Sequence, residues 1–403
     1  MEHYNPIFSK VPTLRFAEFT DEWGKYELSH FVTRITRRNK NNESSLPLTI
    51  SAQYGLVDQI SFFNKTVASV DLSGYYLLYN GDFAYNKSYS NDYAWGAVKR
   101  LDKYEKGCLS SLYFVFRPND NIDSDYLTHY FESSKWHKGI SNIAGEGARN
   151  HGLLNMAVDD YFATKHYLPS LPEQKKIARI FNAITKRIEI QNKIIEDLKI
   201  LKKELCAKLF GSPLCGRIIA IEQVADIYGG YAFNSKAYVN KGKYKIVTIG
   251  NVTGDKYISG NYNTIDRLPN NIQKPQVLSK GDILVSLTGN VGRISIVDGD
   301  EYLLNQRVAK LGIEDDLTKE YIYQYLSNSS FEKDMINAGQ GAAQKNIKNQ
   351  DILSYCIRFP TDQTALENID KLLSLYDMRI TSEKAILSNL ILQKSYYLRA
   401  MFI

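Results

Sequence analysis

Two long stretches of the chain contain neither glycine nor proline, and this absence constrains the fold more than any single motif. They run from residue 173 to 210 and from residue 361 to 403, and all 25 Gly and 10 Pro lie outside them. Because these two residue types are the usual breakers of helices, the pattern predicts two long helices that separate two turn-rich blocks.

The first predicted helix has signals at both ends. Ser170 followed by Glu173 is typical of a capping box, Pro172 is tolerated in a first turn, and Gly211-Ser212-Pro213 would end the helix. At ~1.5 Å per residue, about 38 residues would form a helix roughly 57 Å long. Such a length is unusual within one globular domain.

Apolar residues in both stretches recur in alternating steps of three and four, which is the pattern of a coiled-coil seam. The first seam comprises Ile177, Phe181, Ile184, Ile188, Ile195, Leu198, Leu201, Leu205 and Leu209. The second comprises Leu366, Ile369, Leu373, Tyr376, Ile380, Leu387, Leu390, Tyr397 and Met401. Residues 188–210 and 380–402 align without a gap, and polar Gln191 and Glu383 interrupt the seams at the same position. Unrelated amphipathic helices would look similar, but the preceding blocks also correspond.

The two turn-rich blocks share landmarks in the same order. Asn80-Gly-Asp-Phe83 corresponds to Lys280-Gly-Asp-Ile283, and Gly145-Glu-Gly-Ala148 corresponds to Gly339-Gln-Gly-Ala342. A period near half the chain length indicates a duplicated module rather than a solenoid.

Each block has strand-like runs first and helical patterns later, which favours an α+β fold. We expect strands at 112–116, 244–249 and 282–287, and helices at 125–138 and 319–338. The predicted division is a first domain (1–170, with a lead-in at 1–20), a helix (171–212), a second domain (213–360) and a helix (361–403). The two long helices would pack antiparallel about a pseudo-twofold axis.

The composition is that of a folded chain with two or three domains. Of 403 residues, 44% are hydrophobic, and the 29 Tyr and 17 Phe argue against disorder. No apolar run approaches the ~18 residues of a membrane span, and the first residues lack the layout of a signal peptide. Four Cys without metal or redox spacing favour free thiols and a cytoplasmic protein. The net charge of +6 permits a polyanionic partner without requiring one.

Three segments resemble the specificity subunits of Type I restriction–modification systems. Leu168-Pro-Ser-Leu-Pro-Glu-Gln-Lys-Lys-Ile-Ala-Arg-Ile-Phe181 is similar to the start of the family's central conserved region. Leu14-Arg-Phe-Ala-Glu-Phe-Thr-Asp-Glu-Trp23 resembles a common lead-in, and residues 281–293 resemble part of a target recognition domain. The second long helix departs from this pattern, because it begins with Pro360-Thr-Asp-Gln363.

The resemblance implies a non-catalytic subunit that directs the chemistry of its partners. Each recognition domain would read one half of a bipartite, asymmetric site in double-stranded DNA. The helices would set the spacing of the half-sites and dock two methyltransferase (modification) subunits, joined by nuclease/translocase (restriction) subunits. Adenine methylation and restriction, with S-adenosylmethionine, ATP and Mg, would belong to those partners.

In the first block, residues 79–100 interleave aromatic, polar and basic side chains, which suits a loop that enters a DNA groove. The predicted DNA-binding residues there are Lys87, Ser88 and Arg100, together with Arg149 and Asn150 after the glycine turn. The alternative is a surface hairpin whose tyrosines cover the core.

In the second block, the predicted DNA-binding residues lie in three segments. They are Thr288 and Arg293 in a two-glycine turn, Asn305, Gln306 and Arg307 at an expected strand edge, and Gln344 and Lys345 after the second glycine turn. Alternation along a strand would point Gln306 away from its neighbours. A Gly-x-x-Gly turn alone is a weak signal, since it also occurs in nucleotide loops and plain hairpins.

The first long helix carries ten basic and five acidic residues between 173 and 210, whereas the second is nearly neutral. This excess suits a helix that faces the DNA spacer or acidic patches on a partner. The alternative is a solvated flank of the coiled coil.

Catalytic interpretations find little support. Asn5-Pro-Ile-Phe8 resembles an amino-methyltransferase motif, but no glycine-rich cofactor loop accompanies it, and no Gly-x-x-x-x-Gly-Lys-Ser/Thr loop occurs. Six His lack metal-ligand spacing, and Glu173 is explained as the partner of the Ser170 cap. An enzyme with an undetected site, a scaffold that binds only protein, and a stand-alone DNA-binding protein remain alternatives.

Overall fold

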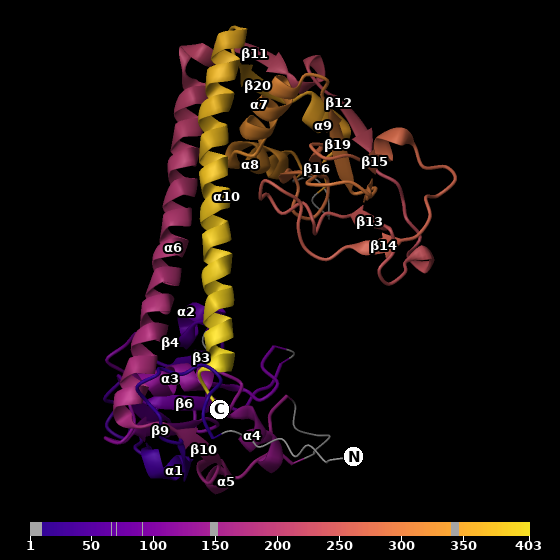
Figure 1. Cartoon of the computed structure of the whole chain (residues 1–403). Coiled ribbons are helices and arrows are strands. Elements are labelled where there is room, and N and C mark those ends of the chain that lie inside the picture. Colours follow the sequence, from indigo (N-terminus) through magenta and orange to yellow (C-terminus); the bar gives the residue numbers. More distant parts are fainter. Residues whose placement is uncertain (1–9, 66, 70, 91, 146–151, 340–345) are drawn as a thin grey trace, which may run out of the picture. The chain divides into compact units, whose positions relative to one another are not determined.

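The computed structural model describes residues 10–65, 67–69, 71–90, 92–145, 152–339 and 346–403. The chain forms two compact units (Figure 1). The first unit comprises Met1–Gln191 with Ile386–Ile403, and the second comprises Asn192–Ala385. The division passes through both long helices rather than at their ends, and each unit is described by itself.

The first unit contains ten of the described strands. An antiparallel sheet has the order β2-β9-β6-β7, and the remaining strands form the pairs β1-β10, β3-β4 and β5-β8. The bounds are β1 (Gly24–Glu27), β2 (Val32–Arg34), β3 (Leu48–Ser51), β4 (Gly55–Asp58), β5 (Tyr76–Tyr79), β6 (Phe83–Asn86), β7 (Ala97–Arg100), β8 (Lys106–Leu109), β9 (Phe114–Pro118) and β10 (Lys165–Leu168).

The second unit has the same plan. Its sheets have the orders β12-β19-β16-β17 and β14-β13-β18-β15, and β11 pairs with β20. The bounds are β11 (Arg217–Ala220), β12 (Asp226–Gly229), β13 (Tyr244–Val247), β14 (Asn263–Ile265), β15 (Val277–Leu278), β16 (Ile283–Ser286), β17 (Ile294–Ile296), β18 (Tyr302–Leu304), β19 (Val308–Gly312) and β20 (Cys356–Phe359).

The predicted duplication is confirmed strand by strand. Each strand of the first unit has its counterpart ten strands later: β2-β9-β6-β7 matches β12-β19-β16-β17, and β1-β10 matches β11-β20. The pairs β3-β4 and β5-β8 match β13-β14 and β15-β18. In the second unit β13 also pairs parallel with β18, and a parallel bridge between Pro47 and Cys108 marks the same neighbourhood in the first.

A shared turn explains the glycine–aspartate landmark of the two blocks. Gly81 and Gly281 both have positive φ, at 87° and 92°, a conformation that favours glycine. The carboxylates of Asp82 and Asp282 each accept a hydrogen bond at 2.8 Å from the backbone N–H three residues earlier. The same backbone geometry therefore requires the same two residue types in both units.

Short helices follow the strands in each unit. The first has α1 (Leu28–Phe31), α2 (Gln59–Phe63), α3 (Ser124–Glu132), α4 (His137–Ile143) and α5 (Val158–Phe162). The second has α7 (Asp316–Leu326), α8 (Ser329–Ala338) and α9 (Asn349–Leu353), with short 3-10 helices at Pro213–Cys215, Ile221–Gln223, Ser235–Ala237 and Lys274–Gln276.

The sequence predicts one helix at 125–138 and one at 319–338. In the structure, each of these predicted helices is replaced by two shorter ones, α3 and α4 in the first unit and α7 and α8 in the second. In the first unit, the Ser133 hydroxyl donates to the Tyr130 carbonyl at 2.6 Å, and the indole N–H of buried Trp136 donates to the Phe131 carbonyl at 3.1 Å. These two side chains thus donate hydrogen bonds to backbone carbonyl groups at the end of α3, and the chain changes direction there instead of continuing the helix. In the second unit, extended backbone at Asn328 separates α7 from α8.

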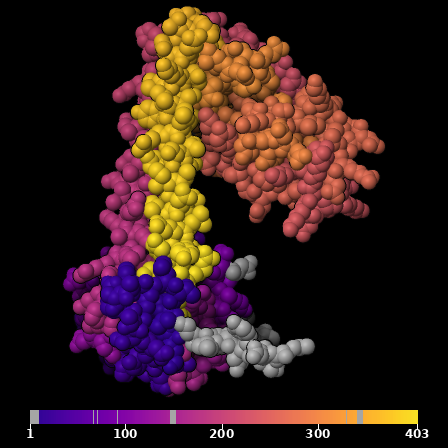
Figure 2. Space-filling model, in the orientation of Figure 1, coloured from indigo at the N-terminus to yellow at the C-terminus, as the bar shows by residue number. Residues whose placement is uncertain are grey.

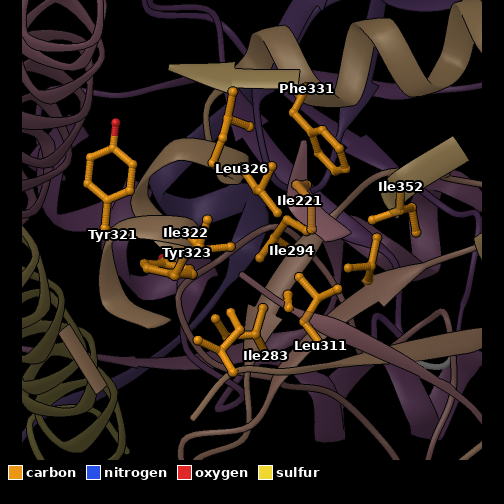
Figure 3. Packing of buried hydrophobic residues seen from close by; sticks show 14 of the residues in the cluster. Ile221, Ile283, Ile294, Leu311, Tyr321, Ile322, Tyr323, Leu326, Phe331 and Ile352 are labelled. Atoms are coloured by element: carbon orange, nitrogen blue, oxygen red, sulfur yellow. The ribbon is translucent and has the colours of Figure 1, made fainter. Parts of the chain in front are cut away.

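The core of the second unit lies between its antiparallel sheet and helices α7–α9. Ile283, Ile294 and Leu311 from three neighbouring strands pack against Ile322 of α7 and Ile352 of α9 (Figure 3). The core of the first unit is more aromatic, and it includes Phe83, Tyr85, Phe116, Tyr130 and Tyr161. Both domains are therefore α+β, as predicted.

Two long helices are present where glycine and proline are absent. α6 spans Leu171–Gly211 and α10 spans Gln363–Ala400 (Figure 1). In the first unit, Phe181 near the start of α6 stacks on Phe402 just after α10, with ring centroids 5.5 Å apart. In the second unit, Lys202 of α6 contacts Asp377 of α10. The helical segments within each unit thus run antiparallel.

The predicted seam is largely confirmed, with one error in α6. All nine seam residues predicted for the second long helix are buried or half-buried, but Leu201 of α6 is 50% exposed. Lys202 turns inward instead, and its ammonium lies 2.6 Å from an Asp377 oxygen. The polar seam residues Gln191 and Glu383 are both buried.

The role predicted for Glu173 is also corrected. Its buried carboxylate accepts two hydrogen bonds from the Arg15 guanidinium at 2.8 Å and one from the Trp23 indole at 3.4 Å. The neighbouring Gln174 side chain accepts from the Asp123 backbone N–H at 2.8 Å, at the N-cap of α3. The start of α6 therefore anchors long-range contacts rather than a local capping box.

Candidate nucleic-acid interface

In the first unit, the chain that leaves β6 lies beside the chain that follows the glycine turn. The Leu154 N–H donates to the Lys87 carbonyl at 3.0 Å, and Ser88 forms an isolated bridge with Leu153. Two segments about 65 residues apart, each predicted to bind DNA, thus meet. Arg149 and Asn150 themselves lie outside the described residues.

The Lys87 side chain is half-buried, and its ammonium contacts an aromatic ring of the protein. Its ammonium lies 4.7 Å from the centre of the Phe114 ring, and burial lowers the pKa of Lys87 from its usual value. Ser88 is exposed, and its N–H donates to the Asn86 side chain at 2.9 Å. A cation fixed on an aromatic ring beside an exposed hydroxyl suits contact with a phosphate or a base edge.

Arg100 has a structural role in the first unit. Its guanidinium donates to Asp102 at 2.6 Å, to Asp125 at 2.7 Å and to the Ser124 hydroxyl at 2.9 Å. The side chain is only 18% exposed. Because two carboxylates already neutralise it, a DNA phosphate would have to compete with them.

The second unit repeats the arrangement and extends it. The Ile347 N–H donates to the Leu287 carbonyl at 3.0 Å, and the Leu287 N–H donates to the Arg307 carbonyl at 3.0 Å. Thr288 forms an isolated bridge with Asn346. The three predicted segments of this unit therefore meet where β16 ends and β19 begins. Gln344 and Lys345 lie outside the described residues.

Thr288 and Arg293 lie on the hairpin between β16 and β17. The Thr288 hydroxyl is buried and, within the segments that the structure describes, has no hydrogen-bond partner. The Arg293 Nε lies 3.2 Å from a Glu332 oxygen of α8, and both side chains are partly exposed. Arg293 is thus oriented by α8 yet still in contact with solvent.

Asn305, Gln306 and Arg307 form a turn, which corrects the expectation of a strand edge. β18 ends at Leu304 and β19 begins at Val308, so the alternation that would turn Gln306 away does not apply. Gln306 and Arg307 are both exposed. Both side chains are therefore available for recognition.

Among the described residues, no group of three or more His, Cys, Asp or Glu side chains could hold a metal ion. None of the helices in the described part of the chain is both long and apolar enough to cross a membrane.

Comparison with known proteins identifies the class. The family model for the Type I restriction modification DNA specificity domain matches residues 35–199 and again residues 217–391. The chain therefore belongs to the family of Type I restriction–modification specificity subunits, and the duplicated match agrees with the duplicated strand order.

One protein of similar sequence and two solved structures of similar fold illustrate the resemblance. The chain is 27% identical over 303 residues to the specificity subunit of the Type I restriction enzyme MjaVIII from Methanocaldococcus jannaschii, spanning 67% of this chain and 69% of that protein. It is similar in fold to the Type I system S subunit from M. genitalium, with a TM-score of 0.56, 16% identity and coverage of 98% and 99%. A chain from a structure on complex assembly and conformational transition of the type I R-M system gives a TM-score of 0.55, with 18% identity and coverage of 93% and 96%.

Proposed function

We propose that this chain reads DNA sequence for a Type I restriction–modification complex, each α+β domain recognising one half of a bipartite, asymmetric site. One observation carries the proposal. The same backbone junction recurs in both units, since the chain after β6 meets residues 153–154 and the chain after β16 meets residues 346–347, and it places Lys87 and Ser88 in one unit and Thr288 and Arg307 in the other at the same position of the fold. Because the side chains on the two copies differ, the two half-sites would differ as well.

In this proposal the recognition domains are residues 1–170 and 213–360, and the helices at 171–212 and 361–403 set the separation of the half-sites. The distance between two bound domains is fixed most simply by a stiff connection, and a continuous helix is stiff. The work would take place in the cytoplasm, with double-stranded DNA as the partner.

Exposed apolar side chains on the long helices support docking of two methyltransferase subunits. α10 presents side chains along its length (Figure 2). Leu375, Met378 and Leu392 are more than half exposed, and Ile200 and Leu201 of α6 are about half exposed. Apolar surface in a row along a helix is typical of a protein interface. Met378→Asp and Leu392→Asp are expected to weaken co-purification with the methyltransferase, whereas Lys40→Asp, at an exposed position outside the long helices, is the control and should not weaken it.

The chain itself would be non-catalytic. S-adenosylmethionine would be held by the methyltransferase subunits, and ATP and Mg by the partners that translocate and cut DNA. Adenine methylation and restriction would thus be directed by this chain and performed by others. Incubation of the purified chain with labelled cofactor and DNA should give no turnover until methyltransferase is added. Turnover by the chain alone would contradict this assignment.

The decisive experiment is methylation-sensitive sequencing of the host genome with and without this gene. One split, asymmetric motif should lose its methylation in the deletion strain. A scaffold that binds only protein predicts no sequence-dependent DNA binding even with methyltransferase present. A stand-alone DNA-binding protein predicts the same preference without it.

A further inference from the structure

Because the two units are duplicates, a segment predicted to bind DNA in one unit has a counterpart in the other, even where that counterpart contains no recognisable sequence motif. The turn Asn305–Arg307 joins β18 to β19, and its counterpart in the first unit joins β8 to β9. Strand register fixes the correspondence from both sides. Before the turn, Leu78 pairs with Gly107 and Leu278 pairs with Tyr302.

The strand pairing after the turn gives the same correspondence between the two units. Phe83 pairs with Phe116, and Ile283 pairs with Leu311. The offset between the units is therefore 195 residues on both flanks of the turn, with no insertion. Ser110, Ser111 and Leu112 consequently correspond to Asn305, Gln306 and Arg307.

The two turns also have the same internal hydrogen bonds. In each, the side-chain oxygen of the first residue lies 3.4 Å from the backbone nitrogen of the third, Ser110 with Leu112 and Asn305 with Arg307. The residue that follows, Tyr113 or Val308, donates its N–H to the carbonyl of the first. One backbone conformation thus presents a third side chain outward in both units, and Leu112 is 64% exposed.

The neighbours of Leu112 are residues already assigned to recognition. Tyr85 of β6 pairs with Phe114 of β9, and the ammonium of Lys87, two residues after Tyr85, lies 4.7 Å from the centre of the Phe114 ring, two residues after Leu112. In the second unit, Leu287 and Arg307 correspond to Lys87 and Leu112. They are hydrogen-bonded to each other, because the Leu287 N–H donates to the Arg307 carbonyl. The turn therefore lies next to the junction that gathers Lys87 and Ser88.

We propose that the Ser110–Leu112 turn is a DNA-reading element of the first domain, in which Leu112 contacts the 5-methyl group of a thymine. This inference rests on the proposed function. An arginine at this position suits the acceptors of guanine, whereas an apolar side chain has no donor to offer and suits the one apolar group in the major groove. The corresponding turns of the two domains would thus read different groups, hydrogen-bond acceptors in the second domain and an apolar methyl group in the first.

The test uses the full chain in complex with the methyltransferase of its own system, and selects binding sites from randomised duplex DNA. Leu112→Ala should relax the preference for one thymine in one half-site and leave the other half-site unchanged. Arg307→Ala should relax a position in the other half-site. Val67→Ala, which removes an exposed apolar side chain from another loop, is the matched control and should change nothing.

A second arm removes only the methyl group, by replacing that thymine with uracil. The wild-type complex should lose about fourfold in affinity, the value expected for one buried methyl group, and the Leu112→Ala complex should lose nothing further. An equal loss in both complexes, or a relaxed position that carries no thymine, would overturn the inference. Absence of any base preference in the wild-type complex would instead refute the proposed function.

Discussion

Arg15 and Glu173 form a doubly hydrogen-bonded ion pair, with both nitrogen–oxygen distances 2.8 Å, although they are 158 residues apart. Glu173 is 1% exposed on its side chain and Arg15 is 13% exposed. The contact ties the lead-in segment to the first turn of α6.

Glu173→Gln should destabilise the first unit, because it leaves the Arg15 guanidinium partly buried without its counter-charge. Loss of one partner of a buried pair typically costs about 3–5 kcal/mol. Urea unfolding followed by near-UV circular dichroism would measure the loss. Glu189→Gln is the control, since Glu189 pairs with Lys186 at an exposed position and should matter by under about 1 kcal/mol. Equal effects of the two variants would contradict the assigned role.

Glu132 should make the first unit sensitive to acid. Burial by itself would raise the pKa of Glu132, but His129 and Lys394 lower it to about 2. A carboxyl group with a depressed pKa stabilises the fold above its unfolded value of about 4.5, and this contribution disappears as the pH falls toward 2. The free energy of unfolding of wild type should exceed that of Glu132→Gln by up to about 3 kcal/mol at neutral pH.

The difference between these two proteins should shrink progressively below about pH 4.5. Other acid-sensitive groups, such as His166, whose pKa burial lowers to about 4, are present in both proteins and cancel in the comparison. A difference that did not vary with pH would show that Glu132 acts through packing rather than charge.

Replacing Arg307 should affect DNA sequence discrimination, whereas replacing Arg100 should affect the stability of the fold. Arg307→Ala should cost roughly 1–3 kcal/mol of discrimination at one base pair, because an exposed guanidinium in a turn is free to read a base edge. Arg100→Ala should instead lower the melting temperature, because it leaves Asp102 and Asp125 without their common partner. Binding to duplexes with single substitutions, alongside thermal unfolding, separates the two. Uniform loss of DNA affinity with Arg307→Ala would indicate a phosphate contact.

Removal of one heptad from each long helix tests their role as a spacer. Deletion of residues 195–201 and 387–393 keeps the phase of both seams, because seven residues make two turns of the coiled coil. The helices would shorten by about 10 Å, or roughly 3 base pairs of B-DNA. Sequencing of methylated sites should show the same half-sites with a shorter spacer. An unchanged spacer would mean that the partners set the distance.

Sequence patterns predicted the long helices, the α+β class and the duplication, because these depend on local breakers and on a repeat visible within one chain. They failed where a distant partner decides the outcome. The apolar pattern allowed Leu201 in the seam, but Asp377 draws Lys202 inward instead. Similarly, Glu173 next to Ser170 suggested a local cap, whereas its partner is Arg15.

For the candidate site, the sequence identified separate segments but not their proximity. Lys87 and the chain after Gly152 meet through one backbone hydrogen bond and an isolated bridge between distant segments, and Thr288 and Asn346 likewise form an isolated bridge. The Ser110–Leu112 turn was missed because it contains no glycine, charge or aromatic residue, and because the sequence predicted a strand at 112–116, whereas β9 begins only at Phe114. Only a comparison of paired strands aligns it with Asn305–Arg307.

The division of the chain into units has a consequence for its synthesis. Residues 192–385 form the second unit as one uninterrupted stretch, so that unit holds all its parts as soon as they have left the ribosome. The first unit also needs residues 386–403, which supply Phe402 to the rings of Phe181 and Tyr126. A stop codon within the last 18 codons would therefore leave residues 192–385 intact and remove part of the core of the first unit, most of which is encoded at the opposite end of the gene.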